Sequence, residues 1–182
     1  LYQCLPIFYG MKKESKNFFN YDNNASDPEQ KKFKVNYWLL LQDLTNNMKS
    51  PCIADLKIGT RTCEITVPLS KLKKRFEESK GTTTYSHAVR CVDICIRQNK
   101  NTIRRYDRKI GRKMSWEDLT KALKDFLSSN EKVQQFADQI KFLKEKLVET
   151  YQIFPNMRLY SASVLIVYDG DNENSPIILK LI

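Results

Sequence analysis

The hydrophobic positions of this chain fall into short runs, and the first of them predict two neighbouring strands. VNYWLLLQDL, at 35–44, carries β-branched and aromatic residues into a continuous apolar run, a pattern typical of a strand buried on both faces. Pro51 opens a second run, CIADLKI, which Gly59 closes. The polar TNNMKSP between them indicates a connector.

Three further segments have helical spacing. PLSKLKKRFEES, at 68–79, begins with a proline and spaces its apolar residues by three and four, which predicts an amphipathic helix. Ser115 followed by WED resembles a capping box with Asp118 in place of the usual glutamate, and it predicts a helix with Trp116, Leu119, Leu123 and Phe126 on one face. A longer helix begins near Asn130, and we expect core contacts along its apolar stripe of Val133, Phe136, Ile140, Leu143 and Leu147.

The remaining segments predict strands and loops. HAVRCVDICIRQ, at 87–98, indicates a strand. RLYSASVLIVYDG and SPIILKLI predict an antiparallel hairpin around DGDNEN, with Gly170 available for a positive φ. The polar stretch at 11–34 indicates a loop or hairpin excursion. We therefore expect an α+β fold.

Composition narrows the class of protein. The chain has 182 residues, of which 41% are hydrophobic and 29% charged, values close to those of globular domains. Its longest apolar runs, at 37–41 and 164–168, are far shorter than the about twenty residues that a membrane span needs, so we expect no membrane span. The termini, LYQCLPIFYG and PIILKLI, indicate cuts through a larger protein.

The cysteines and the histidine do not suggest a catalytic or metal site. Five cysteines without C-x-x-C spacing favour a reducing compartment, cytoplasmic or nuclear, with thiols used as small core hydrophobes. We expect the single histidine, His87, to be a surface residue at the edge of a strand. The glycine-rich phosphate loops and the protein-kinase H-R-D loop are missing from the sequence, which argues against ordinary P-loop, dinucleotide and protein-kinase enzymes.

Basic residues outnumber acidic ones, 31 to 21, giving a net charge of +10. They concentrate at 57, at 71–75 and at 104–113, and the segment RQNKNTIRRYDRKIGRK, at 97–113, contains the densest run. Such residues can bind nucleic acid, form a solvated surface, or converge on one pocket. Because they fall in separate elements, a compact and highly phosphorylated small molecule fits the distribution better than a nucleic acid.

Asp55 and Lys57 lie two residues apart in a predicted strand, so they point to the same side of it. They could form an ion pair at the strand end. They could instead form a ligand site in which the acid accepts hydroxyl hydrogen bonds and the base holds an anion.

PCIADLKIG, Pro51 to Gly59, resembles the P-x-x-x-D-x-K-x-G signature of the inositol polyphosphate kinase family. LLLQDLTNNMKSP is similar to the family's hinge, YDRKIGRKMSWEDLTKAL to its Gly-Arg and helix region, and RLYSASVLIVYDG to its S-S-L-L strand and the following turn. The resemblance runs from about residue 36 to the end. It departs at Ala162, which replaces the first serine.

The resemblance implies a two-lobed fold similar to protein kinases and ATP-grasp enzymes. Residues 1–43 would belong to the N-terminal lobe, 44–50 would form the hinge, and 51–182 would form the C-terminal lobe with a basic helical segment at about 66–85. Ile182 would open the family's I-D-F motif, so the magnesium-binding aspartate would follow it. The N-lobe lysine would precede Leu1.

The resemblance also implies site residues, with Asp55 and Lys57 as the catalytic pair. The backbone of Gln42 and Leu44 would meet the adenine, and Asp43 would belong to the same nucleotide site. Asp55 would accept from the ribose hydroxyls, and Ser163 would lie near the phosphates and metal. Lys57 would hold an inositol phosphate beside the transferred group. Further substrate contacts would come from Lys71, Lys74, Arg75, Lys109 and Arg112.

The implied activity is ATP- and Mg²⁺-dependent phosphoryl transfer to inositol hexakisphosphate, giving a pyrophosphorylated product. The alternatives are a multikinase acting on tris-, tetrakis- and pentakisphosphates, a trisphosphate 3-kinase, and, from another class, a basic nucleic-acid-binding or scaffold domain. We expect an inositol polyphosphate as the partner, no nucleic acid, and a monomeric chain.

Overall fold

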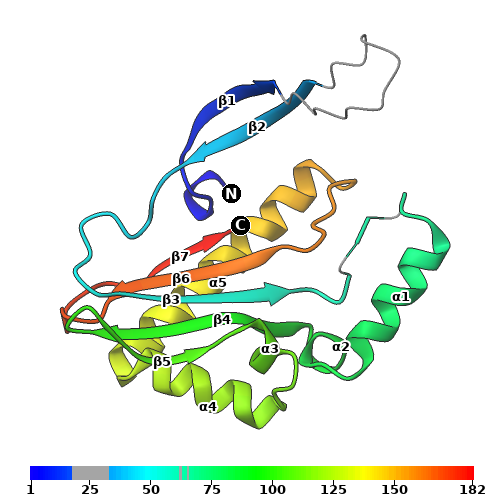
Figure 1. Ribbon diagram of the computed structural model, residues 1–182. Helices are drawn as coiled ribbons and strands as arrows, with labels where there is room; N and C mark the ends of the chain where they lie inside the picture. Colours follow the sequence, from blue (N-terminus) through cyan, green and yellow to red (C-terminus); the bar gives the residue numbers. More distant parts are fainter. Residues whose placement is uncertain (18–32, 62, 65) are drawn as a thin grey trace, which may run out of the picture. The chain divides into compact units, whose positions relative to one another are not determined.

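The computed structural model describes residues 1–17, 33–61, 63–64 and 66–182 (Figure 1). The chain divides into two compact units, Pro6–Asp43 and a larger one made of Leu1–Leu5 and Leu44–Ile182. Leu1–Leu5 thus belong to the larger unit, whereas the family resemblance implied an N-terminal lobe that includes residues 1–43. In the described part of the chain, no helix is both long and apolar enough to cross a membrane.

The smaller unit is a pair of antiparallel strands, β1 (Phe8–Asn17) and β2 (Phe33–Leu41). The middle of the polar excursion, 18–32, lies outside the described residues. The expected burial of β2 on both faces is wrong, since Tyr37 and Leu39 are each 64% exposed. β2 pairs with β1, and among the described residues of this unit no further element covers either face.

The larger unit is built on a five-stranded antiparallel sheet in the order β5-β4-β3-β6-β7. The strands are β3 (Pro51–Ile58), β4 (Val89–Gln98), β5 (Asn101–Tyr106), β6 (Ser163–Asp169) and β7 (Ile178–Leu181). Two long helices, α4 (Trp116–Leu127) and α5 (Asn130–Ile153), pack against the sheet (Figure 1). The other helices are η1 (Tyr2–Cys4), α1 (Leu69–Lys80), α2 (Thr83–His87) and α3 (Arg108–Gly111).

The central strand β3 determines which side chains face the core. Its buried positions alternate, with Cys52, Ala54 and Leu56 on the core side. Asp55 and Lys57 therefore share the opposite side, as their spacing predicts. β3 pairs with β4 and β6, which places Arg90 and Ser163 beside Lys57.

α4 follows its sequence pattern closely. Asp118 donates its backbone N–H to Ser115 Oγ, and Ser115 donates its own to Asp118 Oδ2, both at 3.0 Å. The predicted capping box is therefore confirmed. Leu119 and Phe126 are fully buried. Trp116 stays partly exposed, and its ring stacks on that of His87 with centroids 4.2 Å apart. The expected strand-edge position of His87 is wrong, since this residue ends α2.

α5 contacts the sheet through a face that includes polar residues, unlike the predicted apolar stripe. Gln135 Oε1 accepts the backbone N–H of Ile177 at 3.0 Å, and Gln139 Oε1 accepts that of Leu179 at 2.9 Å. Leu143 is buried as expected, but Val133 and Ile140 are exposed. β7 is one of the two edge strands of the described sheet, and the outward N–H groups of this strand and of Ile177, which precedes it, need acceptors. The glutamines supply these acceptors, which explains the polar contact face.

The hairpin of β6 and β7 is antiparallel as predicted, and the turn between them is held to the connector that precedes β3. Asp169 accepts hydrogen bonds from the backbone N–H groups of Lys49, Ser50 and Asp171 at 2.9–3.1 Å. Asp171 Oδ2 accepts from the Ser50 hydroxyl at 2.7 Å. These bonds attach the end of the 44–50 connector to the turn.

Gly170 is required for a reason other than the expected one. Its φ is not positive. A Cβ atom at this position would lie 2.0 Å from the carbonyl oxygen of Arg97 and 2.9 Å from Cys52 Sγ. The turn therefore needs glycine because another backbone approaches it closely.

Candidate functional site

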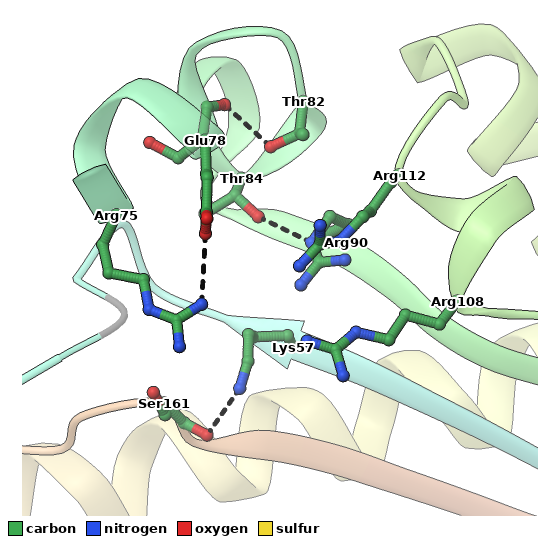
Figure 2. A pocket seen from close by; sticks show the side chains of 10 residues that line it. Lys57, Arg75, Glu78, Thr82, Thr84, Arg90, Arg108, Arg112 and Ser161 are labelled. Carbon is green, nitrogen blue, oxygen red and sulfur yellow. Dashed lines mark hydrogen bonds and ion pairs between the residues drawn. The ribbon is translucent and has the colours of Figure 1, made fainter. Parts of the chain in front are cut away.

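A cavity of about 160 Å³ opens on the side of β3 that carries Lys57. Its walls come from β3, α1, α2, β4, α3 and the segment before β6 (Figure 2). We call it the basic cavity, because five of its lining side chains are cationic. The lining residues are Lys57, Arg75, Glu78, Ser79, Thr82, Thr84, Arg90, Arg108, Arg112 and Ser161.

Lys57 is held by a backbone carbonyl. Its Nζ donates to the carbonyl oxygen of Ser161 at 3.0 Å, and Ser161 has a φ of 56°, a conformation that is uncommon for a residue with a side chain. Burial lowers the pKa of Lys57 and the neighbouring Arg90 lowers it further, whereas Asp55 acts in the opposite direction. The ammonium thus lies in a field that a bound anion would relieve.

Arg90 is the most buried cation of the cavity, at 8% exposure. Its Nε donates to Thr84 Oγ1 at 3.2 Å, while its Nη1 is buried without a hydrogen-bond partner among the described residues. Burial lowers the pKa of Arg90, and the charges of Arg112 and Arg108 lower it further. An unpartnered guanidinium nitrogen surrounded by like charges indicates a site for an anion.

The cavity also contains one acid among its described lining residues. Glu78 and Arg75, three residues apart on α1, form an ion pair with 3.1 Å between Arg75 Nη1 and a Glu78 carboxylate oxygen. Figure 2 shows this contact at the rim, with Lys57 and the other guanidinium groups around the same space. The cavity therefore retains an excess of positive charge. Phosphate groups, which accept bidentate hydrogen bonds from arginine, match this chemistry.

The structure brings together some of the predicted substrate residues but not all. Lys57, Arg75 and Arg112 line the basic cavity. Lys71 and Lys74 on α1 and Lys109 on α3 are exposed and are not among its lining residues. Their substrate contacts stay predictions.

Two lining cations were missed by the sequence analysis. Arg90 interrupts the apolar strand run VRCVDICI, and a charge inside such a run was the available signal. Arg108 belongs to the basic run at 97–113, for which nucleic-acid binding was one of the alternatives. Asp107 accepts the N–H groups of Lys109 and Ile110 at 2.8 and 2.9 Å, which starts α3 directly after β5 and brings Arg108 to the cavity.

Asp55 carries an open acceptor on the same side of β3 as Lys57. Its Oδ1 is buried and has no hydrogen-bond partner among the described residues. Among the ion pairs of these residues, none joins Asp55 to Lys57. A hydroxyl donor fits such an oxygen. The ribose contact that the resemblance implies therefore has suitable chemistry.

The other residues predicted for the nucleotide fall in both units. Gln42 exchanges hydrogen bonds with Ile7 inside the smaller unit, which also contains Asp43. Leu44 is buried in the larger unit. Ser163 is buried at the start of β6, and its backbone N–H donates to the carbonyl oxygen of Ile182 at 2.8 Å. The nucleotide roles of these residues stay predictions.

The described residues offer no cluster of three or more histidine, cysteine, aspartate or glutamate side chains that could hold a metal ion. We therefore assign no residue and no chemical step to such an ion.

The basic residues at 104–105 have partners within the protein. Arg104 forms an ion pair with Asp125, and Arg105 forms a bidentate pair with Asp93 at 3.0 and 3.2 Å. Arg108 belongs to the basic cavity. These pairings reduce the free positive charge that a nucleic acid would meet on this surface.

The sheet and the basic cavity define an α+β protein with a site for a polyanion. A sequence model described as inositol polyphosphate kinase matches residues 38–182, and the chain belongs to this family. The sequence-based assignment to the family is thus confirmed.

The curated relatives include kinases with two kinds of name. Inositol hexakisphosphate kinase 1 of Saccharomyces cerevisiae is 33% identical over 146 residues, which cover 78% of this chain and 14% of that protein. Inositol hexakisphosphate kinase 3 of Mus musculus is 30% identical, covering 79% and 36%. The inositol polyphosphate multikinase of Schizosaccharomyces pombe is also 30% identical, covering 79% and 57%. The chain thus spans between about a seventh and three fifths of these relatives' lengths.

A solved structure supports the fold. The inositol phosphate multikinase of S. cerevisiae, in complex with ADP and Mn²⁺, matches with a TM-score of 0.63 and 19% identity, covering all of this chain and 78% of that one. The expected α+β kinase-like fold is therefore confirmed.

Proposed function

We propose that the protein transfers the γ-phosphoryl group of ATP to a highly phosphorylated inositol that binds in the basic cavity. The observation that carries this proposal is the convergence of Lys57, Arg75, Arg90, Arg108 and Arg112 on one small space. Family membership supports the reaction class.

The charge of the ligand matches the site. A phosphate monoester carries about −1.5 to −2 at neutral pH, so a multiply phosphorylated inositol can neutralise several cations at once. Arg90 Nη1 would gain the hydrogen-bond partner that it lacks among the described residues. Phosphoryl transfer needs little covalent chemistry from a protein, because positioning and charge neutralisation supply most of the rate. Lys57 would hold the accepting phosphate, and the arginines would orient the ring.

The phosphoryl donor is proposed to be ATP, used with a divalent cation such as Mg²⁺. Asp55, with its open Oδ1, would accept from the ribose hydroxyls. The related multikinase structure contains ADP and Mn²⁺, which supports this choice of cofactors. A bound cation would neutralise phosphate charge during transfer.

Inositol hexakisphosphate is the acceptor that we propose, with a pyrophosphorylated product. Two of the relatives described above are named for this substrate. The alternative is a multikinase that acts on tris-, tetrakis- and pentakisphosphates, since a relative with that name matches at similar identity. A panel of inositol phosphates that differ in phosphate number would decide between them.

The test compares Lys57→Ala with Arg105→Ala in a transfer assay with labelled ATP and inositol hexakisphosphate. Lys57→Ala should reduce turnover about 10²-fold or more, as expected for removal of a cation directed at phosphate charge. Arg105→Ala, which removes an exposed cation paired to Asp93 outside the cavity, should leave turnover unchanged. Normal turnover of folded Lys57→Ala at saturating substrates would refute the assigned site. Tight RNA or DNA binding that is lost in Arg105→Ala, without inositol phosphate binding, would favour the nucleic-acid alternative.

A further inference from the structure

Glu78 is an acid in a cavity that is otherwise suited to anions. It lines the basic cavity together with five cations, and its carboxylate contacts Arg75 Nη1 at 3.1 Å (Figure 2). A carboxylate at this place lowers the positive field that a phosphate meets. It also occupies the guanidinium group that a ligand would use.

The ion pair is suited to being opened. Both partners lie on α1, and their side chains remain 43% and 35% exposed. Pairs of this spacing on an exposed helix surface are weak, so a ligand phosphate held by other cations can displace the carboxylate. Lys57, Arg90, Arg108 and Arg112 supply such cations from three other elements.

The same helix contains a matched pair outside the cavity. Glu77 and Lys80 are also three residues apart, with 2.8 Å between Lys80 Nζ and a Glu77 carboxylate oxygen. Neither residue is among those that line the basic cavity. Any general effect of removing an acid from α1 should therefore appear equally at Glu77 and Glu78.

We infer that Glu78 is a displaceable counter-ion that competes with a ligand phosphate for Arg75, and so determines how strongly the cavity holds a polyanion. In the ligand-free protein it holds Arg75 at the rim. When a polyphosphorylated inositol binds, a phosphate takes the place of the carboxylate on the guanidinium. A ligand without a phosphate that reaches Arg75 leaves the pair intact and does not use this cation. The inference rests on the proposed function of the cavity.

The experiment titrates inositol hexakisphosphate into the wild-type protein, Glu78→Gln and Glu77→Gln by calorimetry at low salt. Glu78→Gln removes the competing charge but keeps the size and hydrogen-bonding capacity of the side chain. It should strengthen binding about two- to fivefold, the range set by exposed ion pairs, whereas Glu77→Gln should match the wild type. The gain should shrink at 0.5 M salt because the competing interaction is screened.

Repeating the change Glu78→Gln in an Arg75→Ala protein separates competition for Arg75 from repulsion between the Glu78 carboxylate and the ligand phosphates. In Arg75→Ala, the change Glu78→Gln should give no further gain, because there is no guanidinium left to release. A gain that persists in this background would overturn the competition, as would weaker binding by Glu78→Gln in the wild-type background. Equal binding by Glu78→Gln and Glu77→Gln would also refute it. If the wild-type protein binds no inositol hexakisphosphate, the proposed function fails and this inference fails with it.

Discussion

Replacing Arg90 with methionine should stabilise the ligand-free protein and weaken its binding to inositol hexakisphosphate. Arg90 is buried, its Nη1 has no hydrogen-bond partner among the described residues, and Arg108 and Arg112 place like charges near it. Methionine retains most of the aliphatic length of arginine and removes the charge. The two effects have opposite signs because the cavity is arranged to bind a ligand.

The magnitude follows from two opposing contributions. A buried donor without a partner costs about 1–3 kcal/mol and more when it is charged, whereas the hydrogen bond from the charged guanidinium of Arg90 to Thr84 Oγ1 contributes about 1.5–3 kcal/mol that methionine would lose. These two contributions nearly cancel, so the net gain of about 1 kcal/mol comes from the relief of repulsion by Arg112 and Arg108. For a protein of this size, this gain raises Tm by about 2–4 °C.

The assay is differential scanning calorimetry at low salt, with Arg105→Met as the matched control. Arg105 is exposed and paired with Asp93 outside the cavity, so its replacement should not raise Tm. Saturating inositol hexakisphosphate should raise Tm more in the wild type than in Arg90→Met. A lower Tm for ligand-free Arg90→Met, with unchanged ligand binding, would refute the assignment of Arg90 to an anion-binding site.

Three further predictions concern other parts of the molecule. Gly170→Ala should destabilise the protein by about 1–3 kcal/mol in urea unfolding, because the new methyl group would lie 2.0 Å from a backbone oxygen; an unchanged midpoint would contradict the close approach. Burial and the charge of Arg90 hold the pKa of Lys57 below its usual value, so binding of inositol hexakisphosphate should fall as pH rises through this lowered pKa, where the ammonium loses its charge. Lys57→Arg should remove this dependence. Burial opposes ionisation of Asp169, but the backbone N–H groups of Lys49, Ser50 and Asp171 lower its pKa. Its contribution to stability should therefore be present above about pH 4 and be lost as pH falls through the lowered pKa, and acid unfolding of Asp169→Asn should lack this component.

Local sequence patterns predicted much of the larger unit. The apolar run between Pro51 and Gly59 identified β3, and the two-residue spacing of Asp55 and Lys57 placed them on one side of it. The Ser115–Asp118 spacing located the start of α4. In these segments, the short-range pattern and the tertiary structure favour the same conformation.

The rest depended on contacts between residues distant in the sequence. Arg90 reaches Lys57 through the register of β3 and β4, which shifts after Asp55, and a sequence pattern does not determine such a register. Arg108 reaches the cavity through the turn that Asp107 forms after β5. The polar face of α5 depends on the position of an edge strand that lies more than thirty residues away, as the 38-residue separation of Gln139 and Ile177 shows.

The two glutamines of α5 cover backbone donors to which a strand of another molecule could otherwise add. An exposed edge strand presents unpaired N–H groups to which a strand of another molecule can add. Gln135 and Gln139 occupy these groups at Ile177 and Leu179, so the sheet ends at side-chain amides from its own helix. Leucine at either position would be compatible with the apolar core beside it, yet it would leave a backbone donor available to a neighbouring chain. Here, polar residues at a helix–sheet contact occupy backbone donors at the edge of the sheet, an arrangement that the hydrophobic pattern of the sequence does not reveal.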